Sequence, residues 1–447
     1  MGAVKVERQA VARPLWRNIP FDLVTVGLLA VFAYGFGVWI YQLSNGLIVT
    51  GMRDVVTWGL YITFFMFFVG LSAGGLIVAS AGSIFGVERL KPLSRLAIWV
   101  SFVSVVLAAF FIVPDIGRPD RLWNLIRYPN WSSPLIWDVM IIGVYGLISL
   151  AYLWLLSRRD LAERKSRWTF GFSSLTQRAR DWDKRLIAGM AFVALPAAIS
   201  LHSITAWIFG FQFARPFWFT GIMAPLFITS ALVSGLALLL VIMLVTRQLK
   251  LFEVPKETFS WLGGLLAVFI VADFFLLSAE FLTRQWSQEP AGQAAVNLLM
   301  TGKYMWVFWP EVAFGIIAFG LMFVPRFRMV PALVGAAATL AVVSIFLKRL
   351  GLILVGFYNP IVGAEPGIPL GEVRETTALG LPAISSFEAT GVYAPTWAEV
   401  SIIIGVLALG VLLIMWGVKV LPLWERETAE AADPGSEEQS QEGREPV

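Results

Sequence analysis

The sequence predicts an all-α integral membrane protein with about ten transmembrane helices. Of its 447 residues, 58% are hydrophobic and only 14% are charged. Apolar segments of about 20 residues cross a bilayer as helices, because in hydrocarbon every backbone polar group must be satisfied within the segment. Ten such segments follow one another along the chain. They cover residues 21–42, 55–84, 92–114, 134–157, 186–208, 219–246, 258–282, 305–324, 331–357 and 397–421.

The distribution of lysine and arginine predicts the orientation of these helices. Cytoplasmic connections of membrane proteins carry an excess of both residues. With the N-terminus inside, the inner segments hold 24 of the 34 lysines and arginines, and the outer segments hold eight. We therefore expect a multi-pass protein of a bacterial or archaeal cell membrane with both termini in the cytoplasm. The net charge of +4 then reflects topology and gives no reason to expect a nucleic-acid partner.

Most of the chain is expected to form one polytopic membrane domain, residues 21–421. It follows a polar cytoplasmic segment, residues 1–20, that does not resemble a cleavable signal peptide. It precedes a polar tail, residues 422–447, whose composition is typical of disorder. The largest inner connection, residues 158–185, is interpreted as a solvated basic face. The outer segment 358–396 could cap an outer cavity or contact a partner, and it carries Glu365, Glu372, Glu375 and Glu388.

A weak internal repeat relates the second and sixth segments. They read WGLYITFFMFFVGLSAGGLIVAS and FWFTGIMAPLFITSALVSGLALLL, and both place small residues near mid-span. Small residues let helices approach closely, so packing alone is one explanation. The other explanation is a parallel duplication, in which helices 2–5 and 6–9 form two four-helix bundles flanked by helices 1 and 10.

The chain contains no cysteine and a single histidine, His202. Iron–sulfur clusters need several thiolates, c-type haem attachment needs cysteine, and a haem held by two imidazoles needs two histidines. The sequence therefore predicts no haem, no iron–sulfur cluster and no metal site in this chain. A chain of this composition that handles electrons needs a diffusible organic carrier and a partner that holds the metals.

Three ionisable residues from consecutive helices are expected at one depth near the outer surface: Asp115, Asp138 and His202. Such residues are costly in a membrane and normally face a bundle interior or a cavity. Helix-end positions for the aspartates and an interhelical hydrogen bond for the histidine are structural alternatives. An imidazole and carboxylates at one depth also suit a quinone ring, because its oxygens need hydrogen-bond partners and its redox chemistry moves protons.

A second set of ionisable residues lies in the later half of the chain, mostly in the outer half of the membrane. Two of them, Asp273 and Glu280, are seven residues apart and therefore share a helix face. Depth alone makes the set candidates for a proton route, and interhelical pairing is the structural alternative. The set comprises Asp273, Glu280, Glu311, Lys348 and Arg349.

Two segments carry a resemblance to a known family. DIGRPDRLWNLIRYPNWSSPLIWDV (115–139) resembles the D-L-G-R-P-x-R…S-P-x-x-W signature of the polysulfide reductase membrane subunits, known as NrfD/PsrC-like. LHSITAWIFGFQFARPFWFTGIMAPLFITSALVSG (201–235) resembles the histidine helix and following loop of the ten-helix branch of that family. That branch includes quinol subunits of alternative complex III and of Dsr- and Hme-type complexes. The likeness covers residues 55–357.

The resemblance implies a subunit without redox metals that binds menaquinone or another quinone near the outer face of the first bundle. It implies that Asp115, Asp138 and His202 surround the head group, with Trp137 and Arg118 at its rim. It further implies an extracytoplasmic iron–sulfur, ferredoxin-like partner, together with a further catalytic or haem subunit. In some members the second bundle is proposed to take part in proton movement.

The chain departs from the pattern of alternative complex III at three positions. Members of that complex tend to have a histidine where this chain has Asp115, and another where this chain has Ser72. They also have an aspartate a turn and a half after His202, near Ile208 of this chain. These differences favour a Dsr-, Hme- or dehydrogenase-associated relative and leave the proton route open.

The sequence thus predicts the quinone- or quinol-binding membrane subunit of a multi-subunit respiratory oxidoreductase. It would exchange electrons between the quinone pool and the iron–sulfur partner, with proton translocation as a possible addition. One alternative is a secondary transporter with a mid-membrane site at helices broken by Pro196 and Pro225. The other is a purely structural membrane anchor, in which the buried charges are interhelical pairs.

Overall fold

The computed structural model describes residues 21–53, 56–84, 91, 93–163, 165–251, 255–287, 289–358 and 392–423. Within them, ten helices are long and apolar enough to cross a membrane, which confirms the predicted fold class. They are α1 (Phe21–Asn45), α2 (Leu60–Ile84), α3 (Ser94–Asp115), α5 (Pro134–Glu163), α6 (Gln177–Gly210), α7 (Met223–Gln248), α8 (Lys256–Trp286), α10 (Met305–Phe323), α12 (Pro331–Tyr358) and α13 (Trp397–Val420). The connections contain α4 (Trp123–Arg127), α9 (Pro290–Met300) and α11 (Pro325–Arg328). The segments 1–20 and 424–447 and the four glutamates of 358–396 lie outside the described residues.

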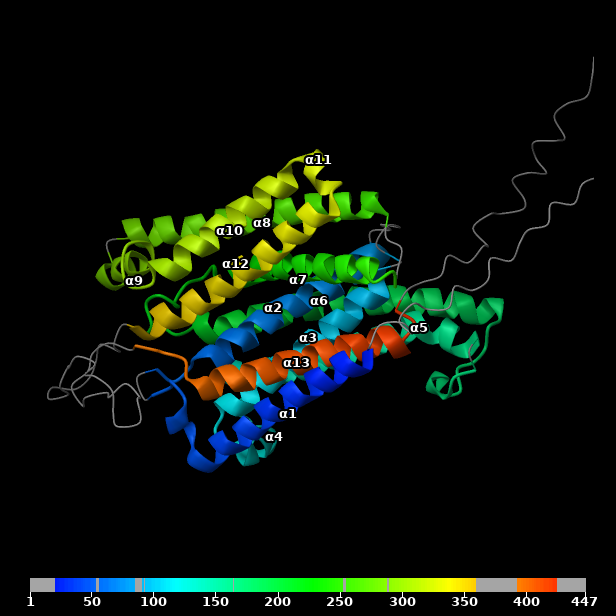
Figure 1. Cartoon of the computed structure of the whole chain (residues 1–447), viewed down its shortest axis with the longest axis horizontal. Coiled ribbons are helices and arrows are strands. Elements are labelled where there is room, and N and C mark those ends of the chain that lie inside the picture. Colours follow the sequence, from blue (N-terminus) through cyan, green and yellow to red (C-terminus); the bar gives the residue numbers. More distant parts are fainter. Residues whose placement is uncertain are drawn as a thin grey trace, which may run out of the picture.

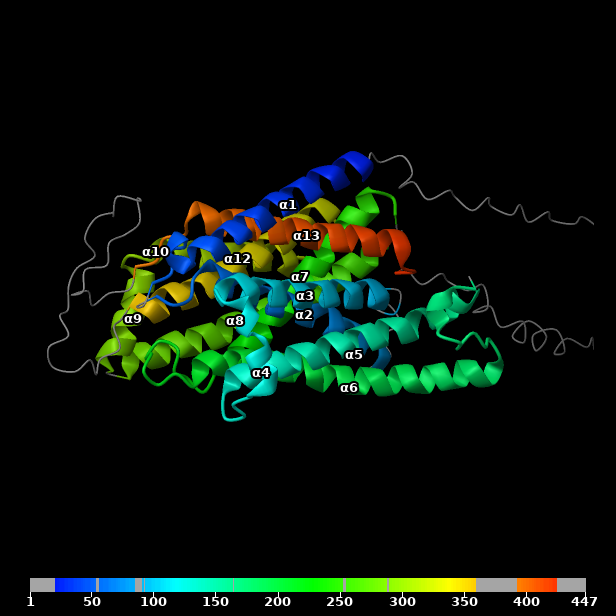
Figure 2. The same ribbon diagram turned by 90° about the horizontal axis from the view of Figure 1, so that it is seen from below.

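Eight of the membrane helices form two four-helix bundles (Figures 1 and 2). In the first bundle α2 packs on α3, α3 on α5, α5 on α6, and α6 on α2. In the second, α7, α8, α10 and α12 close a ring in the same way. The two flanking helices, α1 and α13, pack on each other, and α13 packs on α3. They therefore lie together beside the first bundle, with α1 beginning and α13 ending at the same end of the molecule (Figure 1).

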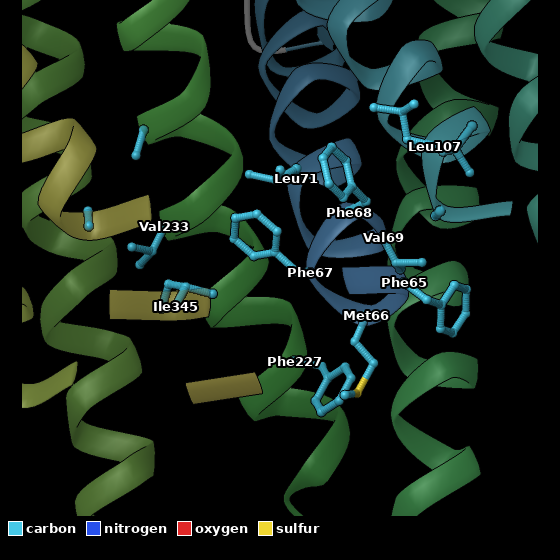
Figure 3. Packing of buried hydrophobic residues seen from close by; sticks show 14 of the residues in the cluster. Phe65, Met66, Phe67, Phe68, Val69, Leu71, Leu107, Phe227, Val233 and Ile345 are labelled. Atoms are coloured by element: carbon cyan, nitrogen blue, oxygen red, sulfur yellow. The ribbon is translucent and has the colours of Figure 1, made fainter. Parts of the chain in front are cut away.

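Helix α2 lies at the centre of the molecule. In its most apolar stretch 82% of the residues are buried, against 11% in α1. Its large side chains point in several directions, and Phe67 faces Val233 and Ile345 of the second bundle (Figure 3). A helix that is apolar on all faces is typical of such a buried position. Because α2 also packs on α7 and α12, it joins the two bundles.

The two small-residue patches of the repeat meet at the boundary between the bundles. A Cβ atom added to Gly74 on α2 would lie 2.2 Å from the carbonyl carbon of Gly235 on α7. One added to Gly235 would lie 2.4 Å from the backbone nitrogen of Gly74. The flanking helices cross in the same manner, since a Cβ on Gly35 would lie 2.7 Å from the Cα of Gly405. Close packing therefore explains why small residues occupy these positions.

Adding a methyl group at the bundle boundary should destabilise the protein. We expect Gly235→Ala to lower the free energy of unfolding by about 1–3 kcal/mol, because the atoms it meets are backbone and cannot rotate away. The matched control is Gly143→Ala on α5, where no atom lies within 4 Å of the added Cβ. Thermal unfolding in detergent measures the difference. Equal midpoints for the two variants would contradict the close approach of α2 and α7.

Helices α5 and α6 extend beyond the spans expected from hydropathy. The first ends at Glu163 and the second begins at Gln177, so both enter the 158–185 connection. Arg158 and Asp183 are buried there and form an ion pair. Arg158 also donates hydrogen bonds to two backbone carbonyl oxygens of the connection. The expectation of a solvated basic face is wrong for this pair, which fixes the connection against the helices.

Candidate functional site

His202 is buried between two helices of the first bundle. Its Nδ1 lies 2.7 Å from the carbonyl oxygen of Ala198 on α6, and its Nε2 lies 3.0 Å from the carbonyl oxygen of Val69 on α2. A neutral imidazole carries one N–H, so both contacts are hydrogen bonds only when both nitrogens are protonated. Loss of a proton therefore breaks one of the two contacts, and the contact between α6 and α2 is the one that breaks when Nε2 loses its hydrogen. A quinone oxygen could reach Nε2 only by displacing the Val69 carbonyl.

Asp138 lies one turn into α5, and it is 3% exposed. Thr205, three residues after His202 on α6, donates a 2.6 Å hydrogen bond from Oγ1 to Asp138 Oδ1. The same hydroxyl lies 2.8 Å from the carbonyl oxygen of Leu201, although it has a single hydrogen. Among the described residues no cation pairs with Asp138. The buried carboxyl group thus shares one hydroxyl with a backbone carbonyl, and this hydroxyl belongs to the same helix as His202.

Asp115, the last residue of α3, faces a different group of residues. The backbone carbonyl oxygen of the preceding residue, Pro114, accepts a 2.8 Å hydrogen bond from the Gln42 side chain of α1. The Asp115 carboxylate interacts electrostatically with Glu399 of α13, and its Oδ1 is buried without a hydrogen-bond partner. Within the described residues no hydrogen bond joins Asp115 to Asp138 or His202. The structure therefore links Asp138 to the helix of His202 through Thr205 and places Asp115 toward the flanking helices.

Glu399 is a fully buried carboxylate that the sequence did not single out. It accepts hydrogen bonds from the backbone N–H groups of Gly51 (2.7 Å) and Thr396 (2.9 Å). The Tyr393 hydroxyl donates a third hydrogen bond at 2.5 Å. Burial and the adjacent Glu399 carboxylate raise the pKa of Tyr393 above its ordinary value, so this hydroxyl keeps its hydrogen. The T-x-x-E spacing of a helix capping box could have revealed Glu399 in the sequence.

The two predicted rim residues lie near the surface. Arg118 is exposed and pairs with Asp120, its Nη2 lying 3.0 Å from the carboxylate oxygen. The Arg118 guanidinium holds the pKa of the Asp120 carboxyl group below its ordinary value. Trp137 is half-buried and donates a 2.7 Å hydrogen bond from its indole N–H to the carbonyl oxygen of Trp131. Both side chains are thus engaged within the connection that contains α4.

The second predicted set converges on one cavity. Its empty volume is about 580 Å³, and it lies between α7, α8, α10 and α12. Four of the five predicted residues line it: Glu280, Glu311, Lys348 and Arg349. The fifth, Asp273, accepts hydrogen bonds of 2.8 and 2.9 Å from the Nζ of Lys348. The sequence grouped these five residues by their expected depth in the membrane, and the structure places them together in the second bundle.

Arg284 also lines this cavity. In the sequence it was only one of the eight lysines and arginines assigned to the outer segments. It pairs with Glu280 one turn earlier on α8. Its Nη1 donates a 2.5 Å hydrogen bond to the carbonyl oxygen of Pro216, and its Nη2 donates a 3.4 Å bond to that of Phe219. Arg284 thereby fixes the connection between α6 and α7 over the cavity. The i, i+4 spacing of the pair is a sequence signal that could have found it.

The part of the chain that forms the two bundles matches the model of a known protein family. The family model described as polysulphide reductase, NrfD, matches residues 48–360. The chain belongs to the NrfD family. The match runs from α2 to α12 and leaves out the flanking helices α1 and α13. Among the described residues of this NrfD-family chain, no group of three or more His, Cys, Asp or Glu side chains could hold a metal ion.

Several relatives align with the NrfD-family chain over nearly its whole length. It is 39% identical to a putative membrane subunit of dimethyl sulfoxide reductase from Halobacterium salinarum, over 91% of this chain and 92% of the relative. It is 27% identical to the Hdr-like menaquinol oxidoreductase integral membrane subunit of Archaeoglobus fulgidus, over 91% and 94%. It is 25% identical to the menaquinone reductase integral membrane subunit of Nitratidesulfovibrio vulgaris, over 92% of each chain. The predicted family is confirmed, and each of these relatives is named as a membrane subunit.

Proposed function

We propose that this chain is the quinone-reactive membrane subunit of a multi-subunit respiratory oxidoreductase. It exchanges electrons between the quinone pool, with menaquinone as the expected species, and an extracytoplasmic iron–sulfur partner. The names of two relatives, which include menaquinol and menaquinone, support the carrier. The absence of cysteine from the sequence supports a partner that holds the metals. Both termini are expected in the cytoplasm, on the side opposite that partner.

The single observation that carries this proposal is the environment of Asp138. A carboxyl group at membrane depth is costly unless it is neutral or paired, and Asp138 is buried with a hydroxyl partner and no cation. A purely structural anchor needs only an acceptor for the Thr205 hydroxyl, which an uncharged side chain supplies at lower cost. Oxidation of a quinol, in contrast, releases protons that need an acceptor close to the ring. His202, one turn from Thr205, supplies a second group that exchanges a proton.

The residues of the first bundle fit a quinone head group in part. A bound quinone supplies the redox chemistry. Asp138 takes up or releases a proton at its carboxyl oxygen, and Thr205 holds that oxygen against α6. His202 exchanges a proton at Nε2 and loses or regains its contact with Val69. Asp115 offers an unpartnered, buried Oδ1 to a hydrogen-bond donor at the end of α3.

The rival transporter interpretation loses its main structural support. Pro196 lies inside α6, which runs without interruption from Gln177 to Gly210. Pro225 lies in the first turn of α7, where a proline is tolerated because the early N–H groups have no intrahelical partner. Neither helix is broken at mid-span, as the binding site of a secondary transporter would require.

Quinone binding should be visible in the fluorescence of the 19 tryptophans. We expect a naphthoquinone inhibitor to quench the purified complex saturably in the micromolar range. His202→Gln should weaken this binding about tenfold, because a charge-assisted hydrogen bond at the ring is lost. The control is Asp181→Asn, an exposed position on the same helix, which should bind as the wild type does. A folded complex that shows no saturable quenching would contradict the proposed function.

A further inference from the structure

The cavity of the second bundle has the lining of a small-molecule site. Such pockets are mostly apolar, with a few polar groups that fix the orientation of the ligand. The apolar lining residues include Met223, Leu226, Phe227, Leu277, Phe281 and Leu352.

Two of the ionisable residues in the wall are satisfied within the protein. Glu280 accepts a 2.6 Å hydrogen bond from Arg284 Nε and a 2.9 Å bond from the Thr220 hydroxyl. Lys348 donates to both carboxylate oxygens of Asp273. These groups hold the second bundle together and leave no donor or acceptor that needs a ligand.

Glu311 on α10 and Arg349 on α12 differ from these pairs. Glu311 is 6% exposed, and its carboxyl group forms no hydrogen bond with the described residues. Arg349 is 2% exposed, and its Nη2 lies 2.5 Å from the Ser230 hydroxyl. Its guanidinium lies 3.7 Å from the centre of the Phe227 ring, and its Nε is buried without a partner. A buried polar group without a partner costs about 1–3 kcal/mol, so a donor and an acceptor in one cavity indicate a missing ligand.

The connection between α6 and α7 covers the cavity at one end. Phe217 and Thr220 of this connection line the cavity, and the Arg284 guanidinium lies 5.4 Å from the centre of the Phe217 ring. The charges in and beside the wall balance, with three acids and three bases. They are Glu280, Glu311 and Asp273 with Arg284, Lys348 and Arg349. A covered, apolar and electrically balanced cavity favours a neutral, membrane-soluble ligand over an anionic head group.

We propose that this cavity is a second binding site for a quinone-type head group, apart from the His202–Asp138 cluster. The Arg349 guanidinium donates to one ring oxygen, and the Glu311 carboxylate accepts from the hydroxyl group at the other, so the site takes the reduced, quinol form of the ring. The apolar side chains pack against the ring. This inference rests on the proposed function, because it assumes that the complex uses a quinone.

Arg349 also relates the cavity to the first bundle. Its guanidinium acts electrostatically on both Glu311 and His202.

Equilibrium binding of radiolabelled menadiol, the reduced form of menadione, to the purified complex under anaerobic conditions tests the inference by stoichiometry. We expect two equivalents per chain in the wild type. Leu277→Trp fills the cavity and should leave one equivalent. The matched control is Leu282→Trp on the same helix, where the side chain is exposed, and it should keep both equivalents. Glu311→Gln, which removes charge without changing size, should weaken one of the two sites about tenfold.

Each outcome separates this inference from the proposed function. One equivalent that is lost in His202→Gln and kept in Leu277→Trp would overturn the second site and leave the proposed function intact. One equivalent that is lost in Leu277→Trp and kept in His202→Gln would support the cavity as a quinone site and overturn the assignment to the first bundle. No binding by a folded complex would overturn both. If Leu277→Trp fails to assemble, an unchanged affinity in Glu311→Gln overturns the inference by itself.

Discussion

Quinol oxidation by the assembled complex is expected to fall about 100- to 1,000-fold when Asp138 is replaced with asparagine. The asparagine side chain has the same size and can still accept the hydrogen bond from Thr205. It cannot take up a proton, and positioned proton transfer contributes about 10²–10⁴-fold to catalysis. Turnover with a soluble naphthoquinol, normalised to the amount of assembled complex in the membrane, measures the effect.

Two further variants distinguish proton exchange from local packing at Asp138. Thr205→Val removes the hydroxyl group and keeps the carboxyl group, so turnover should fall only a few-fold. Asp181→Asn makes the same chemical change at an exposed position of α6 and should leave turnover unchanged. Turnover of Asp138→Asn within twofold of the wild type would remove Asp138 from the proposed mechanism.

Loss of one partner from the Asp273–Lys348 pair is expected to lower the free energy of unfolding by about 3–5 kcal/mol. In Asp273→Leu the Lys348 ammonium group stays buried and loses both of its carboxylate contacts. The double variant Asp273→Leu/Lys348→Met should recover most of the stability, because no uncompensated charge remains. Thermal unfolding in detergent compares the wild type, the single variant and the double variant.

The same double variant separates the two interpretations of this pair. If the pair only joins α8 to α12, the stable double variant should turn over quinol and release protons as the wild type does. If the pair belongs to a proton route, the double variant should be stable and should lose proton movement across proteoliposome membranes. A single variant as stable as the wild type would contradict a structural contribution.

Hydropathy predicts the membrane helices well because each needs a long apolar run. All ten expected segments became helices, with boundaries within a few residues at most ends. The exceptions are the inner ends of α5 and α6, where polar sequence continues as helix. Arg158 and Asp183 stabilise these extensions, but they lie 25 residues apart and have no local spacing signal. Only the tertiary structure brings them together.

The candidate site in the first bundle was only partly predictable. Depth along a helix can be read from sequence, and it placed Asp115, Asp138 and His202 in one layer. The rotation of each helix about its axis is set by packing, and it directs Asp115 toward Glu399. The partners of His202 are backbone carbonyl oxygens, which are present at every residue and leave no signature in the sequence.

The pairing of the first and last membrane helices has a consequence for biosynthesis. Helix α1 is synthesised before both bundles, whereas its packing partner α13 is synthesised after them. At about 5–20 residues per second, the roughly 350 residues between them take about 20–70 s to synthesise. During that interval α1 lies in lipid without α13, and its almost entirely apolar sequence suits that exposure. A nascent chain stalled before α13 would hold both bundles complete, and α1 would still lack the helix on which it packs.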